Sequence, residues 1–249
     1  MCASYGLGGG PYGDLGLSPL DQRENKVLLN EWAGMWGGKA NTTRNSKKGV
    51  NLNPVILAPS GERELDLAWW WFHQGGQPAK YTAFNSRDDS LMSKWRAGFQ
   101  RRALLPATWY MEGGKRWSLD HGELFAMAAI LSDRTMPDGS TGVAYSLVTR
   151  DGVGEAATVT TARGDSRMPL ILPAEVHDEW LSPHRPGDES LVRMVQDQSR
   201  EISLEMTANP LGGMKEAVAE LREEGFSTPE IADVLWITED QVRTHIAQH

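Results

Sequence analysis

The most reactive arrangement in the sequence is a cysteine at position 2, directly after the initiator methionine. Methionine removal normally tolerates a small second side chain, so Cys2 would carry a free α-amine beside its thiol. The amine condenses with an aldehyde to an imine, and the thiolate then closes a five-membered thiazolidine. An α-amine titrates near pKa ~8 and a thiol near ~8.5, so reactive fractions of both exist at neutral pH. The alternative is that position 2 only reflects the translation start.

The composition predicts an ordinary globular protein. Charged residues make up 23% and hydrophobic residues 40% of the 249 residues, enough for one sizeable core and a small appended module. The single cysteine excludes a disulfide framework and a cysteine-rich zinc site, and we expect no metal and no cofactor. No apolar run reaches the ~18 residues of a spanning helix, which predicts a cytoplasmic protein without a membrane partner. With a net charge of −8, any contact with nucleic-acid phosphates needs a local basic surface.

Short apolar and β-branched runs, punctuated by Gly, Pro, Asn and Asp, predict many strands of one mixed sheet or barrel with few helices. The predicted strands cover residues 55–57, 65–72, 104–109, 124–130, 142–149, 157–161 and 170–171. Helical patterns cover residues 19–32, 90–100 and 174–181. These elements define a first domain over residues 2–209.

A second domain is predicted over residues 213–249, where three short helical patterns form a helix-turn-helix-like unit. Ser227 with Glu230, and Thr238 with Gln241, have the spacing of capping boxes. The pattern is typical of duplex-DNA readers. However, three basic and eight acidic residues give this segment a net charge of −5, which favours docking to a protein partner or dimerisation over duplex reading.

Five segments place polar side chains beside strand-like runs. They are Met1-Cys2-Ala3-Ser4-Tyr5, Asn51-Leu52-Asn53-Pro54, Asn85-Ser86-Arg87-Asp88-Asp89, Pro106-Ala107-Thr108-Trp109-Tyr110-Met111-Glu112-Gly113 and Arg167-Met168-Pro169-Leu170-Ile171-Leu172. In order and spacing they resemble the motifs of the SOS-response-associated peptidase (SRAP) family over most of residues 1 to about 209. The resemblance implies an α+β fold (α/β in the broad sense): a β-barrel-type mixed sheet with flanking helices and a basic cleft for single-stranded DNA. Residues 213–249 would add a small all-α tail.

The resemblance also implies roles for individual residues. Cys2 would form a stable crosslink with the ring-opened sugar at an abasic site, and Asn85 would position its amine or the sugar. Arg87 would bind phosphate, and Glu112 would act as general acid and base. Imine formation needs a proton shuttle, which a carboxylate with a raised pKa supplies, and a guanidinium suits phosphate. The alternative for Arg87 and Glu112 is a partly buried ion pair.

The chain departs from the family pattern at three places near these residues. Asp165 stands where the family has a histidine that is thought to assist sugar ring opening and crosslink reversal. An ionised carboxylate is a poor acid, so the crosslink is expected to form more slowly or to resist reversal. Ser4 replaces an arginine beside Cys2, which removes a phosphate contact, and Gly113 replaces a tryptophan after Glu112.

Further DNA contacts are expected from scattered basic and aromatic side chains. The candidates are Arg44, Lys48, Trp70, Arg101, Arg102 and Arg167. The tryptophan would stack an unpaired base at ~1–3 kcal/mol. The alternatives are a solvated basic rim for the cations and a core position for the tryptophan, since strand neighbours point to opposite faces.

The leading hypothesis is an abasic-site sensor on single-stranded DNA, cytoplasmic and associated with the nucleoid, that acts through Cys2 after removal of Met1. One alternative is an SRAP-fold DNA-binding or protein-interaction module with altered chemistry, of host or viral origin. Another is an autoprocessing peptidase, which ranks last because the sequence shows no convincing cysteine–histidine pairing.

Overall fold

In a computed structural model of the protein, the described residues are 4–7, 17–35, 41–43, 52–119, 123–160, 164–209, 218–219, 221–235 and 239–247. The predicted site residues Cys2, Arg44 and Lys48 lie outside them. Within the described part of the chain, no helix has the length and apolar character that a membrane crossing requires.

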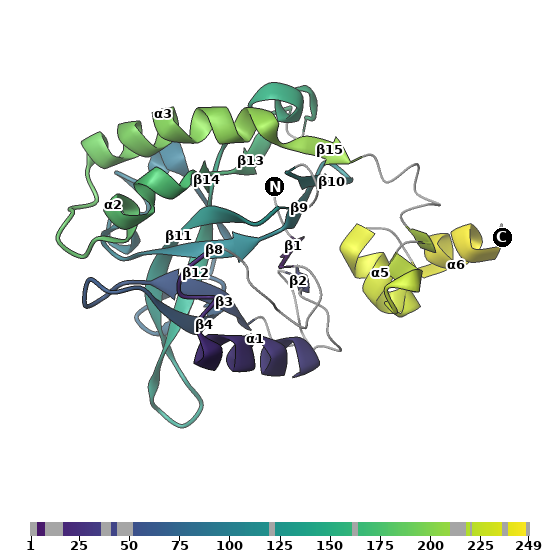
Figure 1. The fold of residues 1–249 in the computed structure, drawn as a ribbon, viewed down its shortest axis with the longest axis horizontal. Helices are drawn as coiled ribbons and strands as arrows, with labels where there is room; N and C mark the ends of the chain where they lie inside the picture. Colours follow the sequence, from purple (N-terminus) through teal and green to yellow (C-terminus); the bar gives the residue numbers. More distant parts are fainter. Residues whose placement is uncertain are drawn as a thin grey trace.

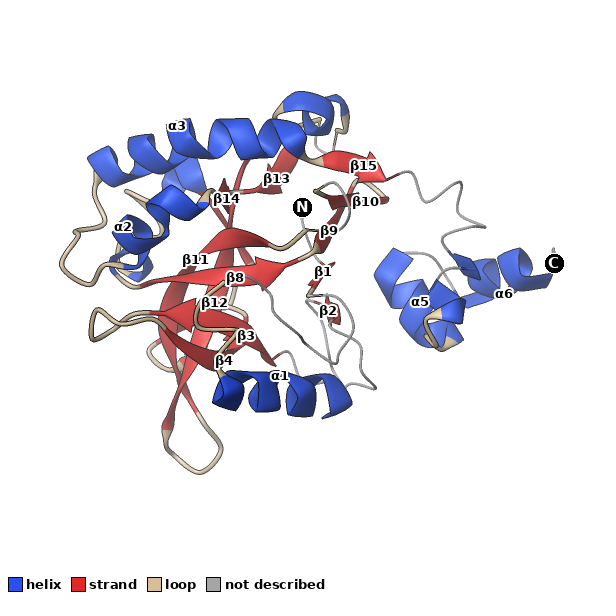
Figure 2. Cartoon of the chain, in the orientation of Figure 1, coloured by secondary structure: helices blue, strands red, loops and turns tan. Residues whose placement is uncertain are grey.

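A closed five-stranded barrel forms the centre of the molecule (Figure 2). Its strands are β3 (Leu52–Leu57), β4 (Glu64–Trp70), β8 (Arg102–Ala107), β11 (Phe125–Thr135) and β12 (Thr141–Asp151). They pair in the order β12-β4-β3-β8-β11, and β11 pairs with β12 to close the circle. The β12–β4 pair is parallel and the others are antiparallel, so the barrel is mixed as predicted.

Alternate residues of the barrel strands enter two different cores. On β8, Leu104 packs with helix residues in one hydrophobic cluster, whereas Leu105 packs in a second cluster shared with the smaller sheet. Both faces of β8 are therefore buried, which explains why its sequence is a continuous apolar run instead of an alternating one.

Helices cover the outside of the barrel (Figure 1). They are α1 (Arg23–Met35), α2 (His177–Leu181) and α3 (Glu189–Glu205). Helix α3 begins at Asp188, whose carboxylate accepts a hydrogen bond from the N–H of Leu191 at 2.9 Å. Its residues Leu191, Val192 and Val195 recur at helical spacing and are buried against the barrel core.

A smaller antiparallel sheet lies beside the barrel in the order β15-β10-β9-β1-β2. Its strands are β1 (Ser4–Gly6), β2 (Asn41–Thr43), β9 (Trp109–Glu112), β10 (Lys115–Ser118) and β15 (Thr207–Asn209). Short strands complete the fold: β5 (His73–Gln74) pairs with β6 (Gln77–Pro78), while β7 (Asn85–Arg87), β13 (Arg167–Pro169) and β14 (Ile171–Leu172) extend the barrel sheet.

Two predicted elements were wrong, and one helix was missed. Of the strand expected at 157–161, residues 157 and 158 end a 3-10 helix, η4 (Gly154–Thr158), and Thr160 forms only an isolated bridge with Ser166. The helix expected at 90–100 consists of turns between η1 (Asp88–Ser90) and η2 (Gly98–Gln100). A further 3-10 turn, η5 (Ala174–Val176), leads into α2. The missed helix is α3, whose amphipathic pattern the sequence nevertheless carries.

The C-terminal segment contains α5 (Thr228–Leu235) and α6 (Glu239–Ala247). Their apolar side chains form a third hydrophobic cluster that also includes Trp109 and Met111 of β9. The expected capping interaction at α5 is present, because Glu230 accepts hydrogen bonds from the backbone and hydroxyl of Ser227.

Candidate active site

Two short strands bring Arg87 and Arg167 to the same end of β12. Strand β7 pairs parallel with β12, with Arg87 opposite Thr149, and β13 pairs antiparallel, with Arg167 opposite Asp151. Thr149 is also paired with Pro169, so β7 and β13 must lie on opposite edges of β12. The two arginines thus approach one another from strands that are far apart in sequence.

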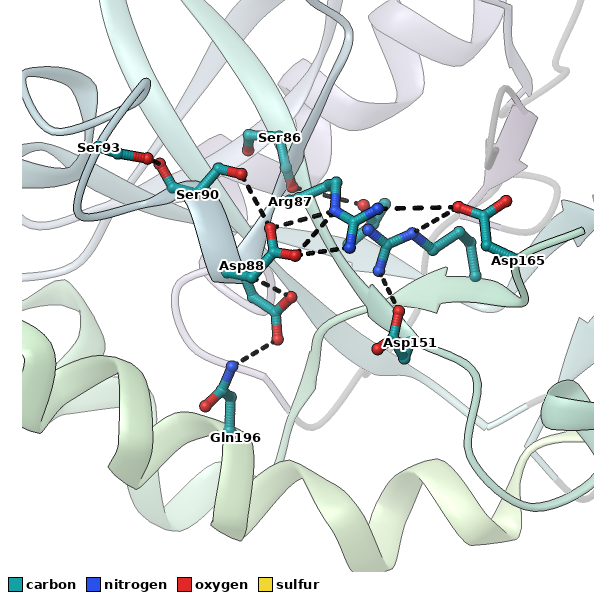
Figure 3. Close-up of polar contacts among 11 residues, drawn as sticks. Ser86, Arg87, Asp88, Ser90, Ser93, Asp151, Asp165 and Gln196 are labelled. Carbon is teal, nitrogen blue, oxygen red and sulfur yellow. Dashed lines mark hydrogen bonds and ion pairs between the residues drawn. The ribbon is translucent and has the colours of Figure 1, made fainter. Parts of the chain in front are cut away.

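Asp165 contacts the guanidinium groups of both arginines from one side (Figure 3). Its Oδ2 is 3.8 Å from Nη1 of Arg87 and 3.5 Å from Nε of Arg167. The residue that replaces the family's histidine is therefore held by two cations. The two guanidinium groups thus compensate the negative charge of the Asp165 side chain.

Each arginine has a second carboxylate partner. Nη2 of Arg87 lies 2.5 Å from Oδ2 of Asp89, and this hydrogen bond is the main cause that raises the pKa of Arg87 and lowers that of Asp89. Nη1 of Arg167 donates to Asp151 at 2.6 Å. The sequence analysis did not predict that Asp89 and Asp151 pair with these arginines. Asp89 stands only two residues after Arg87 in the sequence. Phosphate must compete with these carboxylates for either guanidinium.

Glu112 stands at the end of β9, where a glycine pair turns the chain into β10. Gly113 and Gly114 have φ angles of 61° and 73°, and they form a two-residue hairpin that places Lys115 opposite Glu112. A Cβ at Gly113 would also lie 2.0 Å from Cγ1 of Val159. This turn therefore has no room for the tryptophan that the family pattern carries at this position.

Burial makes Glu112 a candidate acid. Its side chain is 7% exposed, and burial is the main cause that raises its pKa. The negative charge of Asp165 adds to the rise, while a hydrogen bond to the backbone of Gly113 opposes it. The interaction with Asp165 places Glu112 in the electrostatic neighbourhood of the arginine cluster. A carboxyl with a raised pKa can donate a proton and take it back, as the predicted role requires.

Asn85 begins β7 opposite Leu147 and is partly buried. Since side chains two residues apart on a strand share a face, Asn85 and Arg87 point the same way. The strand therefore presents an amide and a guanidinium together. The structure thus brings together four predicted residues around the end of β12: Arg87, Glu112, Asp165 and Arg167.

The strand that precedes the site residues in sequence, β1, is anchored to the barrel from inside. The hydroxyl of Tyr5 lies 2.6 Å from that of Tyr145, and Asn53 donates to the Tyr145 oxygen at 2.8 Å. One edge of β1 pairs with β2 and the other with β9, where Ser4 lies opposite Met111. The N-terminal segment therefore meets β9 one residue before Glu112.

Two residues predicted to contact DNA are buried in the structure. Trp70 is fully buried, stacks on Tyr145 and donates to the carbonyl of Phe84, so no base can reach its face. Arg102 is 5% exposed, and its guanidinium donates to the carbonyl oxygens of residues Phe99, Trp180, Ser182 and Arg185. Trp70 and Arg102 therefore belong to the protein core. For Trp70 this is the alternative that the sequence analysis gave.

Arg101 is exposed but lies at the wrong end of β8. The strand's six residues span about 20 Å, and its far end leads through Thr108 into β9. Arg101 instead pairs with Asp133 at 2.6 Å. Arg167 is in the site but only 3% exposed, so it holds Asp151 and Asp165 in place more readily than it meets solvent phosphate.

The C-terminal helices add little positive charge to the molecule's surface. Arg243 of α6 donates to Glu239 and Asp240 of the same helix, at 2.6 and 2.7 Å. Within the described residues, no group of His, Cys, Asp and Glu side chains is arranged to hold a metal ion.

The closed mixed barrel with flanking helices is an SRAP-like α+β fold. The family model of the SOS response associated peptidase (SRAP) matches residues 24–211. The chain therefore belongs to the SRAP family, a DNA-damage-associated family, and the resemblance inferred from the motifs is confirmed. The matched range begins after Cys2.

One solved structure shows the same fold, and two others are reported with lower similarity. A protein from Bordetella bronchiseptica is 16% identical with a TM-score of 0.54, over 78% of this chain and 92% of that one. A phage-related protein from the same organism is 16% identical with a TM-score of 0.48, over 68% and 79% of the two chains. A protein from Bacteroides thetaiotaomicron is 20% identical with a TM-score of 0.46, over 58% and 67%. No match was found among curated proteins.

Proposed function

We propose that this protein senses abasic sites in single-stranded DNA by forming a covalent link through Cys2 after removal of Met1. The observation that carries the proposal is the position of the buried Glu112 beside the N-terminal strand. Ser4 pairs with Met111, and chain connectivity keeps the Cα of Cys2 within about 7 Å of that of Ser4. This arrangement supports the proposal, because an acid with a raised pKa would then lie near the Cys2 amine and thiol.

The chemistry balances without a cofactor. The Cys2 amine attacks the sugar aldehyde to give a carbinolamine, which Glu112 protonates so that water leaves and an imine remains. The Cys2 sulfur then adds to the imine carbon, and the thiol proton passes to nitrogen through the Glu112 carboxylate. The net change is one aldehyde plus one aminothiol to a thiazolidine plus water.

Arg87 is the best-placed phosphate ligand in the described part of the site. Its guanidinium is about half exposed, and its partners Asp89 and Asp165 are themselves partly exposed, so they are exchangeable. Asn85 on the same face of β7 would orient the sugar or the amine. The protein would act in the cytoplasm at the nucleoid, where single-stranded DNA arises.

The test is a denaturing gel of the protein incubated with an oligonucleotide that contains one abasic site. We expect a slow-migrating adduct, its loss in Cys2→Ala, and an intact mass that lacks Met1. An oligonucleotide with a tetrahydrofuran residue has no aldehyde and serves as the matched control. A retained Met1, or an adduct that persists in Cys2→Ala, would overturn the role of Cys2.

Two alternatives remain for that experiment to separate. A binding module without chemistry would retain the oligonucleotide on a native gel and give no adduct. For the peptidase, two described histidines offer no support, because His73 and His177 are buried and bond backbone carbonyls of Trp71 and Leu172.

A further inference from the structure

The outer face of β9 carries an apolar contact that the crosslinking chemistry does not use. Trp109 and Met111 point away from Tyr110 and Glu112, because neighbours on a strand face opposite sides. Both are nearly fully buried, and they share a hydrophobic cluster with the C-terminal segment. Its members from that segment are Val218, Leu221, Ile231, Ala232 and Val242.

The C-terminal helices also reach the far side of β1. Helix α5 contacts β2, and β2 and β9 are the two neighbours of β1 in the smaller sheet. Figure 1 shows α5 beside the β1–β2 edge of that sheet. The helical unit therefore contacts the strands on both sides of β1 while Tyr5 anchors β1 on the inner side.

Strand β1 needs such support because it is short. It has three residues, so only a few hydrogen bonds to β2 and β9 oppose its local opening. The C-terminal helices pack on β9 and β2. If β1 opened, Trp109 and Met111 would also lose buried contacts. Motion of β1 would move the segment that bears Cys2 relative to Glu112.

We propose that the C-terminal helical unit is an intramolecular clamp on the β9-β1-β2 ladder, with Trp109 and Met111 as positioning residues for Cys2. Its effect on crosslinking rests on the proposed function, whereas its effect on β1 does not. The clamp accelerates the covalent step by holding the reacting groups in register. The partner of this unit's apolar face is thus the chain itself, and the internal ion pairs of Arg243 leave α6 poorly suited to duplex phosphate.

The test uses full-length variants. Ile231→Asp places a charge in the cluster and leaves every barrel residue unchanged, and Met111→Lys does the same from the strand side. Met111→Leu is the conservative variant, and Val27→Lys, on the exposed face of α1, is the control for an added charge. Hydrogen exchange is measured at residues 4–7 and 228–235, together with adduct formation at saturating oligonucleotide and the Kd for the tetrahydrofuran oligonucleotide.

We expect the two disruptive variants to speed exchange in β1 and α5 by about tenfold or more. Adduct formation should slow by about tenfold while the Kd stays within about twofold, and the conservative and control variants should resemble the parent. Fast exchange in α5 with unchanged exchange in β1 would overturn the clamp. If the parent forms no adduct while β1 still responds, the clamp stands and the crosslinking proposal fails.

Discussion

Arg102 and Arg87 are both strand residues, but Arg102 bonds to backbone carbonyls and Arg87 to side-chain carboxylates. Arg102 donates to four backbone carbonyls inside the protein, and burial lowers its pKa to about 10, which leaves it charged at neutral pH. Arg87 meets carboxylates that are themselves partly exposed. Carbonyls of the fold cannot leave, whereas surface carboxylates can be replaced by phosphate. An arginine's partners, more than its exposure alone, therefore separate a structural cation from a ligand-binding one.

The largest effect is expected at Arg102. Arg102→Met should lower the free energy of unfolding by about 3 kcal/mol or more, because two buried and two partly buried carbonyls lose a charged donor. Denaturant unfolding followed by tryptophan fluorescence measures this. Arg102→Lys is the matched variant and should recover only part of the loss, since an ammonium cannot span all four oxygens. A loss below about 1 kcal/mol for Arg102→Met would contradict the structural role.

Glu112 extends the comparison of buried and exposed charged groups. Burial raises its pKa, which is the direction that the proposed acid role needs. Glu112→Gln should slow adduct formation by about 100-fold, since the proton shuttle is lost. In the parent, the rate should fall at low pH as the amine is protonated, and at high pH as Glu112 loses its proton. A single rising pH profile in the parent would exclude Glu112 as the acid.

The same raised pKa predicts a pH-dependent stability difference. A buried carboxyl with a folded pKa above its unfolded value favours the fold at low pH, and this contribution is lost as pH rises through the folded pKa. Glu112→Gln should therefore be more stable than the parent at neutral pH and lose that advantage below the ordinary glutamate pKa. Thermal unfolding at several pH values measures the difference.

Arg87 should affect DNA and barely affect the fold. Arg87→Gln should reduce the slope of log K against log salt for single-stranded DNA by about 0.7, the contribution of one phosphate contact. Its unfolding free energy should change by no more than about 0.5 kcal/mol, because its ion pairs are exposed. Arg101→Gln is the control at the distant end of β8. An equal slope change there would show that neither arginine marks the site.

The smallest effect is expected from the carboxylates, and its sign is informative. Asp89→Asn removes the closest competitor of phosphate at Arg87, so single-stranded DNA should bind about two- to fivefold more tightly. Asp133→Asn, beside Arg101, is the control and should leave binding unchanged. Weaker binding in Asp89→Asn would mean that Asp89 orients Arg87 instead of competing with its ligand.

Local sequence patterns predicted the barrel well. The continuous apolar runs of β8 and β11 arise because both faces of these strands are buried, so the strand prediction held although the alternation expected of a half-exposed strand was absent. Helix α3 was missed although the Asp188 cap, the apolar spacing and the preceding Pro186-Gly187 are all visible in the sequence. Only residues 157 and 158 of the expected strand at 157–161 lie in η4, which begins at Gly154 with a φ of 59°.

The candidate site was predicted in part. The order of the motifs identified Asn85, Arg87, Glu112 and Asp165 as residues worth following, but gave no distances between them. Trp70 and Arg102 were misjudged because burial depends on which elements pack over a strand, and this cannot be read from one strand's sequence.

By itself, the sequence determined the residue types and their order: Cys2, Arg87, Glu112 and the acidic segment 213–249. The order of these motifs was enough to predict the family, because a family is recognised from the order and spacing of residues along the chain. Only the tertiary structure decided which charges meet: Asp165 with both Arg87 and Arg167, Arg102 among carbonyls, and the C-terminal helices against Trp109 and Met111. Electrostatic and packing energies depend on distance in space, and strands β7, β9 and β13 bring together residues that the sequence separates.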